Sequence, residues 1–234
     1  MTRRRWIADE TNGNTAALVG DHAVHLTRVL RAEIGEEFDL ATGTAVRRGT
    51  ITSLTDKRVE FALGEAQFIA PASDLTLALA IFKFDRMEWA IEKCTELGVT
   101  RIIPIVANRT DPHLAAAATK RRERWQRIAL QASEQSRRPG PPEIAAPAKL
   151  KEFASGTGSR IVLAESENNT RLRDALQPCP SDVTLAIGPE GGWTADELQW
   201  FRDSGWTAAS LGDTILRAET AAIVATALAL DALR

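Results

Sequence analysis

The chain has 234 residues, of which 44% are hydrophobic and 26% charged, with a formal net charge of −2 at pH 7. This balance is typical of a globular protein of one or two domains and excludes a largely disordered chain. The sequence contains no uncharged apolar stretch of about 18 residues, which excludes a membrane-spanning helix. Its two cysteines, Cys94 and Cys179, are too few for a disulfide framework or a zinc site. They suit a reducing cytosol, so we expect a cytoplasmic protein.

Short runs rich in β-branched residues, separated by turn residues, dominate the first 70 residues. They predict strands at 37–42, 45–54 and 58–63. One helix is predicted from Asp21, as its N-cap, to near Gly35. We therefore expect a small barrel-like β module in this part of the chain.

After a linker predicted at residues 71–74, the pattern changes to alternating strands and helices. Such alternation is typical of a parallel α/β sheet. Asp85 and Glu88 have the spacing of a capping box, and Gly98 is expected to end the helix that they begin. The predicted strands are 75–82, 101–106, 161–164, 183–187 and 208–211, and the predicted helices include 85–97, 119–136 and 220–233.

The strongest candidate for a functional site is the segment from Val183 to Trp193. It predicts a buried strand, a loop with three glycines, and a helix that begins with a capping box of Thr194 and Glu197. Ligands of open parallel sheets bind at the carboxyl ends of the strands, where this loop would lie. Glycines there let the backbone approach a ligand closely, which favours a binding site over a plain turn. The loop residues are Gly188, Pro189, Glu190, Gly191 and Gly192.

Glu190 limits the kind of ligand that this loop could bind. A carboxylate would repel a phosphate, whereas it suits ribose hydroxyls or a cationic group. The loop also lacks the GxGxxG spacing of dinucleotide-binding folds. We therefore expect neither a phosphate-cradling loop nor a dinucleotide site.

A second strand, loop and helix follow at the C-terminal end. Gly212 lies in the loop, and Arg217 and Glu219 stand where the chain enters an alanine-rich helix. A charged pair beside a buried helix is either a structural ion pair or part of a functional site. Two glycine loops at the ends of successive strands favour a functional site.

The helix expected at 220–233 is apolar around most of its circumference, so it must be buried on several sides. Its small residues permit close packing inside the domain or against a second subunit. We therefore expect a homodimer.

Basic residues gather in two places. Those on the helix at 119–136 are most simply explained as a solvated face. The arginines of the β module are expected to give it a local positive excess, which suits RNA phosphates. The helix carries Lys120, Arg121, Arg122, Arg124 and Arg127, and the module carries Arg3, Arg4, Arg5, Arg28, Arg31, Arg47 and Arg48.

The chain's histidines, His22, His25 and His113, have no carboxylate or cysteine at metal-ligand spacing. No metal site is predicted, and no Ser/His/Asp arrangement is present.

The two glycine loops, at 187–192 and 211–221, closely resemble those of the bacterial 16S ribosomal RNA uridine-N3 methyltransferase family. That family belongs to the SPOUT superfamily of knotted methyltransferases. Three further blocks, at 25–31, 85–99 and 124–136, are similar to blocks of the same family. Together the blocks span nearly the whole chain.

The resemblance implies an α/β fold with a PUA-like RNA-binding β-barrel at 1–71 and a parallel methyltransferase domain with a trefoil knot at 74–234. Family members are homodimers that use S-adenosylmethionine (AdoMet) to methylate N3 of one uridine in the 16S rRNA of the 30S subunit. By analogy, fourteen residues would bind AdoMet: Leu163, Ala164, Glu165, Ile187, Gly188, Pro189, Glu190, Gly191, Gly192, Leu211, Gly212, Ile215, Leu216 and Thr220.

For this reaction we expect Arg217 and Glu219 to be catalytic, with Arg217 steadying the developing uracil anion and Glu219 orienting Arg217 or the substrate. As an alternative, Glu219 or Glu190 accepts the proton. Because N3 lies on the Watson–Crick edge, the uridine must be unpaired or extruded. Arg86 and Arg109 are expected to contact RNA, together with Arg3, Arg4, Arg5, Arg28 and Arg31.

Several positions depart from the family pattern. Phe84 stands where a glycine usually precedes the Asp-Arg-Met-Glu block, and Trp193 replaces a phenylalanine. Asp213-Thr214 replaces a Pro-Arg or Pro-Lys pair, and Ala218 replaces a threonine. The framework of both loops is retained, but Thr214 lacks the basic side chain that would contact RNA or cofactor.

Two other functions stay open. The chain could be a related knotted enzyme acting on another RNA, or a non-catalytic RNA-binding protein of ribosome assembly. The retained glycine loops speak against the non-catalytic protein. A simple nucleotide-binding α/β protein is disfavoured by Glu190.

Overall fold

The structure is a computed structural model that describes residues 5–43, 45–68, 74–153, 158–178 and 181–233. The chain divides into two compact units, the first formed by residues 1–71 and 133–140 and the second by 72–132 and 141–234. Among the described residues, no helix is both long and apolar enough to cross a membrane.

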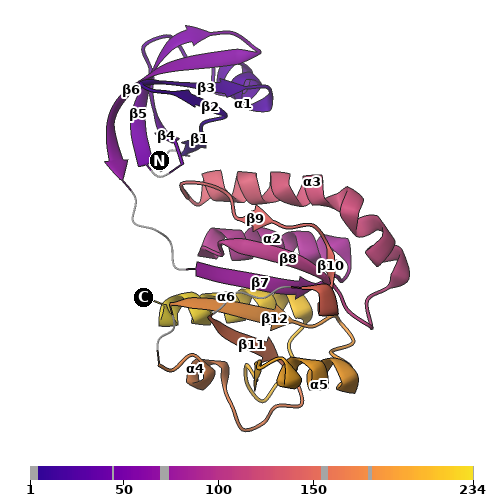
Figure 1. Cartoon of the computed structure of the whole chain (residues 1–234). Coiled ribbons are helices and arrows are strands. Elements are labelled where there is room, and N and C mark those ends of the chain that lie inside the picture. Colours follow the sequence, from indigo (N-terminus) through magenta and orange to yellow (C-terminus); the bar gives the residue numbers. More distant parts are fainter. Residues whose placement is uncertain (1–4, 44, 69–73, 154–157, 179–180, 234) are drawn as a thin grey trace. The chain divides into compact units, whose positions relative to one another are not determined.

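The first unit contains a six-stranded sheet that curls on itself (Figure 1). Its strand order is β1-β4-β5-β6-β3-β2, with β1 parallel to β4 and every other pair antiparallel. Alternate residues of the strands point inward, and Trp6, Leu40 and Phe61 are fully buried in the core. The strands are β1 (Trp6–Ile7), β2 (Glu10–Asn12), β3 (Thr15–Val19), β4 (Glu37–Ala41), β5 (Ala45–Leu54) and β6 (Arg58–Phe68).

The three strands expected in this unit are confirmed, and β6 is longer than predicted, whereas the helix expected from Asp21 to Gly35 is wrong in its cap and its length. A short helix α1 (Asp21–Val24) passes into a π-helix η1 (His25–Val29), and the cap position is Gly20. The helix ends because Arg31 takes a left-handed backbone conformation, with φ 53°. The sequence does not reveal this helix end, since positive φ is uncommon for a residue other than glycine.

The second unit contains a seven-stranded sheet in which all described pairings are parallel, as predicted. Its order is β10-β8-β7-β12-β11-β13, and β9 also pairs with β8. The sequence did not predict the two-residue strands β9 and β10. The strands are β7 (Asp74–Ala80), β8 (Arg101–Val106), β9 (Glu143–Ile144), β10 (Ala148–Lys149), β11 (Ser159–Leu163), β12 (Asp182–Ile187) and β13 (Thr207–Ala209).

Helices cover both faces of this sheet (Figure 1). In β7, Leu75, Leu77 and Leu79 pack in the core that contains residues of α2 and α6, whereas Ala78 and Ala80 pack in the core that contains residues of α5. The sheet therefore buries larger side chains on one face and smaller ones on the other, and the helices on both faces make a three-layer unit. The helices are α2 (Phe84–Leu97), α3 (Pro112–Gln135), the 3₁₀ turn η2 (Leu150–Glu152), α4 (Leu172–Ala175), α5 (Ala195–Asp203) and α6 (Ala218–Ala232).

The capping box predicted at the start of α2 is wrong. Lys83 is the cap residue, and no side chain caps the helix. Glu88 instead accepts a hydrogen bond from Arg124 Nε of α3 at 2.7 Å. Glu88 therefore forms an ion pair with a neighbouring helix instead of capping its own helix. Gly98 does end the helix, with φ 127°.

Phe84, where the family has glycine, packs in the same contact between α2 and α3. Its ring lies edge-on to Trp125, with centroids 5.9 Å apart. The Arg121 guanidinium lies 4.9 Å from the centre of the Phe84 ring. The bulky residue therefore joins α2 to α3 through ring and cation–π contacts.

The capping box predicted for α5 is confirmed. Thr194 Oγ1 accepts from the Glu197 backbone N–H at 3.3 Å, and Glu197 Oε2 accepts from the Thr194 backbone N–H at 2.8 Å. The other oxygen of Glu197 accepts from the Asn108 backbone N–H at 2.7 Å. One buried carboxylate therefore fixes both the start of α5 and the loop after β8.

We predict that Thr194→Ala destabilises the second unit, because it removes the oxygen that caps α5. The expected loss is about 1 kcal/mol, or about 2–4 °C in the melting temperature of a chain of this size. Thermal melting followed by circular dichroism measures the change. Thr119→Ala in the interior of α3 is the matched control, since Thr119 is exposed and caps no helix. Equal melting temperatures for the two variants would contradict the prediction.

Candidate functional site

A cavity of about 880 Å³ lies at the carboxyl edge of the parallel sheet, within the range of about 300–1,000 Å³ that small-molecule sites occupy. The loops that follow β11, β12 and β13 form most of its wall, and α2, α5 and α6 contribute residues from their first turns and beyond. Parallel strands direct these loops to one edge, as expected for a ligand site of this fold class.

Most residues predicted to bind a cofactor line this cavity. Thr220 is the exception, since it lies on α6 outside the lining. Of the charged residues predicted to act in the site, Arg86, Arg109 and Arg217 line the cavity and Glu219 does not. The lining residues predicted as cofactor contacts are Leu163, Ala164, Glu165, Ile187, Gly188, Pro189, Glu190, Gly191, Gly192, Leu211, Gly212, Ile215 and Leu216.

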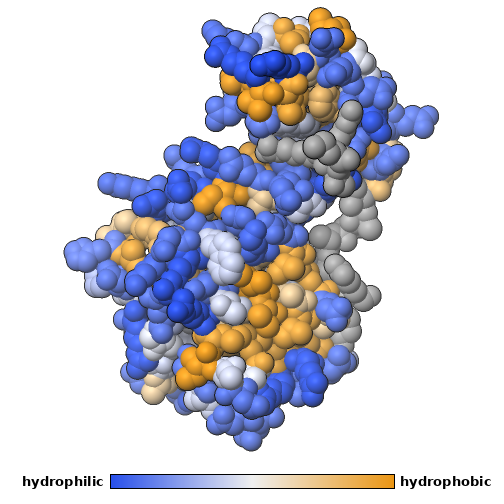
Figure 2. All heavy atoms as spheres, turned by 180° about the vertical axis from the view of Figure 1, so that it is seen from behind, coloured by the Kyte–Doolittle hydropathy of each residue, from blue (hydrophilic) through white to orange (hydrophobic). Residues whose placement is uncertain are grey.

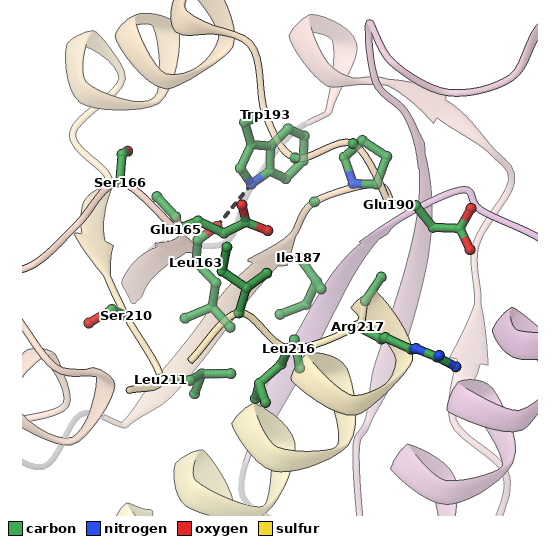
Figure 3. A pocket seen from close by; sticks show the side chains of 18 of the residues that line it. Leu163, Glu165, Ser166, Ile187, Glu190, Trp193, Ser210, Leu211, Leu216 and Arg217 are labelled. Atoms are coloured by element: carbon green, nitrogen blue, oxygen red, sulfur yellow. Dashed lines mark hydrogen bonds between the residues drawn. The ribbon is translucent and has the colours of Figure 1, made fainter. Parts of the chain in front are cut away.

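The middle of the cavity is apolar. Figure 3 shows Leu163, Ile187, Leu211 and Leu216 gathered together, with the Trp193 ring beside them. Trp193 Nε1 donates a hydrogen bond to the Leu163 carbonyl at 3.1 Å, which a phenylalanine at this position could not make. The family departure at Trp193 therefore adds a link between two of the loops.

The loop after β12 needs glycine at two positions. A Cβ atom on Gly188 would lie 3.2 Å from Trp193 Nε1, closer than side chains normally approach. Gly192 has φ 71°, and its N–H donates to the Pro189 carbonyl at 2.8 Å to close a tight turn. L-residues with side chains rarely adopt this conformation.

Two charged residues, Glu190 and Arg217, lie at one side of the cavity, whereas the Glu165 carboxylate lies near Trp193 (Figure 3). Glu190 Oε1 accepts a hydrogen bond from Arg86 Nη1 at 2.7 Å. Arg109 donates to the Gly191 carbonyl. Two arginines that the sequence assigned to RNA thus contact the glycine loop of their own chain.

Glu219 is buried, with 5% of its surface exposed, at the first turn of α6. Its Oε1 lies 3.8 Å from Arg86 Nε. The ion-pair partner of Glu219 among the described residues is therefore Arg86, whereas the sequence analysis expected Glu219 to orient Arg217 or the substrate. Arg217 is exposed, and within the described chain its guanidinium contacts no carboxylate.

Twelve of the 28 lining residues were not among the predicted contacts. Most of them lie within three residues of a predicted contact, which was the available signal, whereas Leu198 and Arg202 lie on α5, away from any predicted contact. Arg171 belongs to this region: its Nη2 donates to Asp213 Oδ1 at 2.6 Å, which places a guanidinium beside the loop that lacks a basic residue at Thr214. The missed lining residues are Ser166, Asn168, Trp193, Ala195, Leu198, Arg202, Ala209, Ser210, Asp213, Thr214, Ala218 and Ala221.

Cys94 takes no part in this chemistry. It is buried on α2 against Thr226, and burial raises the pKa of its thiol to about 12. Such a thiol is protonated at neutral pH and is not a nucleophile. Cys179 lies outside the described residues.

The positive excess expected for the N-terminal module is wrong, since residues 1–71 contain nine basic and ten acidic side chains. Arg28 is paired with Asp56 at 2.6 Å, and Arg5 donates to the Arg137 carbonyl. Arg31 is exposed and contacts no acidic group of the described chain. Arg3 and Arg4 lie outside the described residues.

Comparison with known proteins gives consistent matches. The model of the RNA methyltransferase domain family matches residues 70–230. The ribosomal RNA small subunit methyltransferase E of Synechocystis is 35% identical over 227 residues, covering 91% of this chain and 72% of the relative. The protein of the same name from Rickettsia conorii is also 35% identical, covering 90% of this chain and 87% of the relative.

Solved structures agree. A crystal structure of a ribosomal RNA small subunit methyltransferase E from Neisseria gonorrhoeae, bound to S-adenosyl methionine, has 30% sequence identity and a TM-score of 0.84. The match covers 96% of this chain and 95% of that one. The family resemblance of the two glycine loops is thereby confirmed, and this chain belongs to the RNA methyltransferase family, among the ribosomal RNA small subunit methyltransferases E.

Proposed function

We propose that this protein transfers a methyl group from AdoMet to N3 of a specific uridine in the 16S rRNA of the small ribosomal subunit. The observation that carries the proposal is the cavity at the carboxyl edge, in which an apolar wall meets the cation of Arg217, which contacts no carboxylate among the described residues. Family membership supports methyl transfer to small-subunit rRNA.

The lining fits AdoMet in three respects. Leu163, Ile187 and Leu216 offer an apolar wall suited to an adenine ring. Glu165 and Glu190 offer carboxylates suited to hydroxyl or ammonium groups. Gly188, Gly191 and Gly192 let the backbone approach a ligand closely. AdoMet, when bound, supplies a methyl group activated by its sulfonium.

The residues of the chain then act on the uridine. The base must be unpaired or extruded for N3 to reach the pocket, because N3 lies on the Watson–Crick edge. Arg217 faces the growing negative charge of the uracil as N3 loses its proton. Of the two carboxylates considered as proton acceptor, only Glu190 lines the cavity, so Glu190 is the candidate.

The proposal includes the family's architecture. Residues 1–71 would form a PUA-like barrel that contacts RNA through exposed cations such as Arg31, and residues 74–234 would form the knotted SPOUT domain. The curled sheet of the first unit and the all-parallel sheet of the second support this assignment. The partner would be 16S rRNA or the 30S subunit, in the cytoplasm.

We also propose that the protein is a homodimer. On α6, Ala222, Ala225 and Ala229 are buried in the unit, whereas Leu228 is 41% exposed. Figure 2 shows a broad apolar area on the larger unit. Such an area on a monomer commonly marks an interface, and α6 would pack there against the partner.

Methyl transfer from labelled AdoMet to unmodified 30S subunits and to naked 16S rRNA tests the reaction, with nucleoside analysis of the product. We expect 3-methyluridine. Transfer to another base, or to another RNA only, would assign the chain to a different substrate. AdoMet binding without transfer to any RNA would favour the non-catalytic role.

We predict that Arg217→Ala lowers kcat by about 10²–10³-fold, since it removes the cation that faces the developing anion. The AdoMet dissociation constant should change little, because the apolar wall is intact. Methyl-transfer kinetics and calorimetric titration with AdoMet measure the two quantities. A large loss of AdoMet affinity would reassign Arg217 to the cofactor.

We predict that Leu228→Arg converts a dimer to a monomer, because it places a charge in the proposed α6 interface. Light scattering coupled to size-exclusion chromatography measures the mass. Ile34→Arg is the matched control, since Ile34 is 68% exposed in the other unit. A wild-type monomer, or a dimer that tolerates Leu228→Arg, would remove α6 from the interface.

A further inference from the structure

Arg86 contacts two acidic side chains that come from different parts of the pocket. Its Nη1 donates to Glu190 Oε1 at 2.7 Å, in the loop after β12. Its Nε lies 3.8 Å from Glu219 Oε1, at the start of α6. Arg86 itself lies in the first turn of α2. One guanidinium therefore joins the start of α2 to two segments that each lie more than a hundred residues further along the chain.

Glu219 is the buried member of this group. One of its carboxylate oxygens, Oε2, has no hydrogen-bond partner among the described residues. Burying a carboxylate costs free energy unless a cation lies beside it. Removing that cation leaves a buried, uncompensated charge, which destabilises the folded state. Arg86 is the cation that the described structure places beside Glu219. The ion pair with Glu219 therefore fixes the position of the Arg86 side chain.

Glu190 is the exposed member. The loop that carries Glu190 is short and rich in glycine, so its own turn gives it little support. Two arginines contact it from outside: Arg86 at the Glu190 carboxylate and Arg109 at the Gly191 carbonyl. A planar guanidinium presents separate edges to two carboxylates, which a lysine ammonium on a flexible stem does not reproduce.

We propose that Arg86 is a positioning residue of this site: anchored by Glu219, it holds Glu190 and thereby keeps the Gly188–Gly192 loop in the shape that binds the cofactor. This replaces the role in RNA contact that the sequence assigned to Arg86. The inference rests on the proposed AdoMet site for its effect on affinity, but the effect on the loop concerns the free protein.

A double-mutant cycle tests the link between Arg86 and Glu190. Arg86→Gln, Glu190→Gln and the double variant are titrated with AdoMet by calorimetry. We expect Arg86→Gln to weaken binding by about tenfold, and Glu190→Gln to add little once Arg86 is gone. Arg86→Lys should restore only part of the affinity.

Hydrogen exchange gives a readout that needs no cofactor. The Gly192 N–H donates to the Pro189 carbonyl within the loop, so its exchange rate reports on the turn. We expect faster exchange at Gly192 in Arg86→Gln. The control is Arg101→Gln, which breaks an ion pair of 3.2 Å with Glu143 at the start of β8. This control should change neither exchange at Gly192 nor AdoMet affinity.

The outcomes separate the two proposals. Additive losses in the cycle together with unchanged exchange at Gly192 would overturn the role of Arg86 while leaving the AdoMet site in place. A wild-type protein that fails to bind AdoMet, with faster exchange in Arg86→Gln, would remove the proposed function and keep Arg86 as the residue that holds the loop. Unchanged hydrogen exchange at Gly192 in Arg86→Gln, together with no AdoMet binding by the wild type, would contradict both proposals.

Discussion

Strand β12 lies between β7 and β11 and runs parallel to both, with Ile187 opposite Leu79 and Ala186 opposite Val162. Because every described strand of this sheet runs the same way, the chain leaves β11, β12 and β13 at one edge. Each exit produces a loop there, and the loops can reach one another only because the strands that carry them are neighbours or next neighbours. The cavity, its glycines and its charged residues all depend on this alignment.

The glycine loop combines opposite requirements. Its glycines allow the backbone to turn sharply and to lie close to Trp193, but they also leave the loop with few side chains to fix it. The structure compensates with contacts from outside: Trp193 bonds to the Leu163 carbonyl, and arginines bond to Glu190 and Gly191. Positioning by groups outside the loop is how a flexible segment can present a defined surface to a ligand.

The first unit has no large net charge, and many of its charged side chains form local ion pairs. The first 71 residues carry almost equal numbers of basic and acidic side chains, and several arginines there contact carboxylates. Within the described residues, Arg31 of the first unit and Arg217 of the second contact no carboxylate. Unpaired guanidinium groups retain their capacity for phosphate and base contacts.

The sequence by itself determined the five longer strands of the parallel sheet, the capping box at Thr194 and Glu197, and the two loops that line the cavity. These features are local: apolar runs, glycines and cap residues act on their neighbours in the chain. It did not determine which carboxylate each arginine contacts. Glu88 has the spacing of a cap but pairs with Arg124, and Glu219 stands beside Arg217 in sequence but pairs with Arg86. Those partners come from elements that only the packing of α2 against α3 and α6 brings together, so the tertiary structure alone decided them.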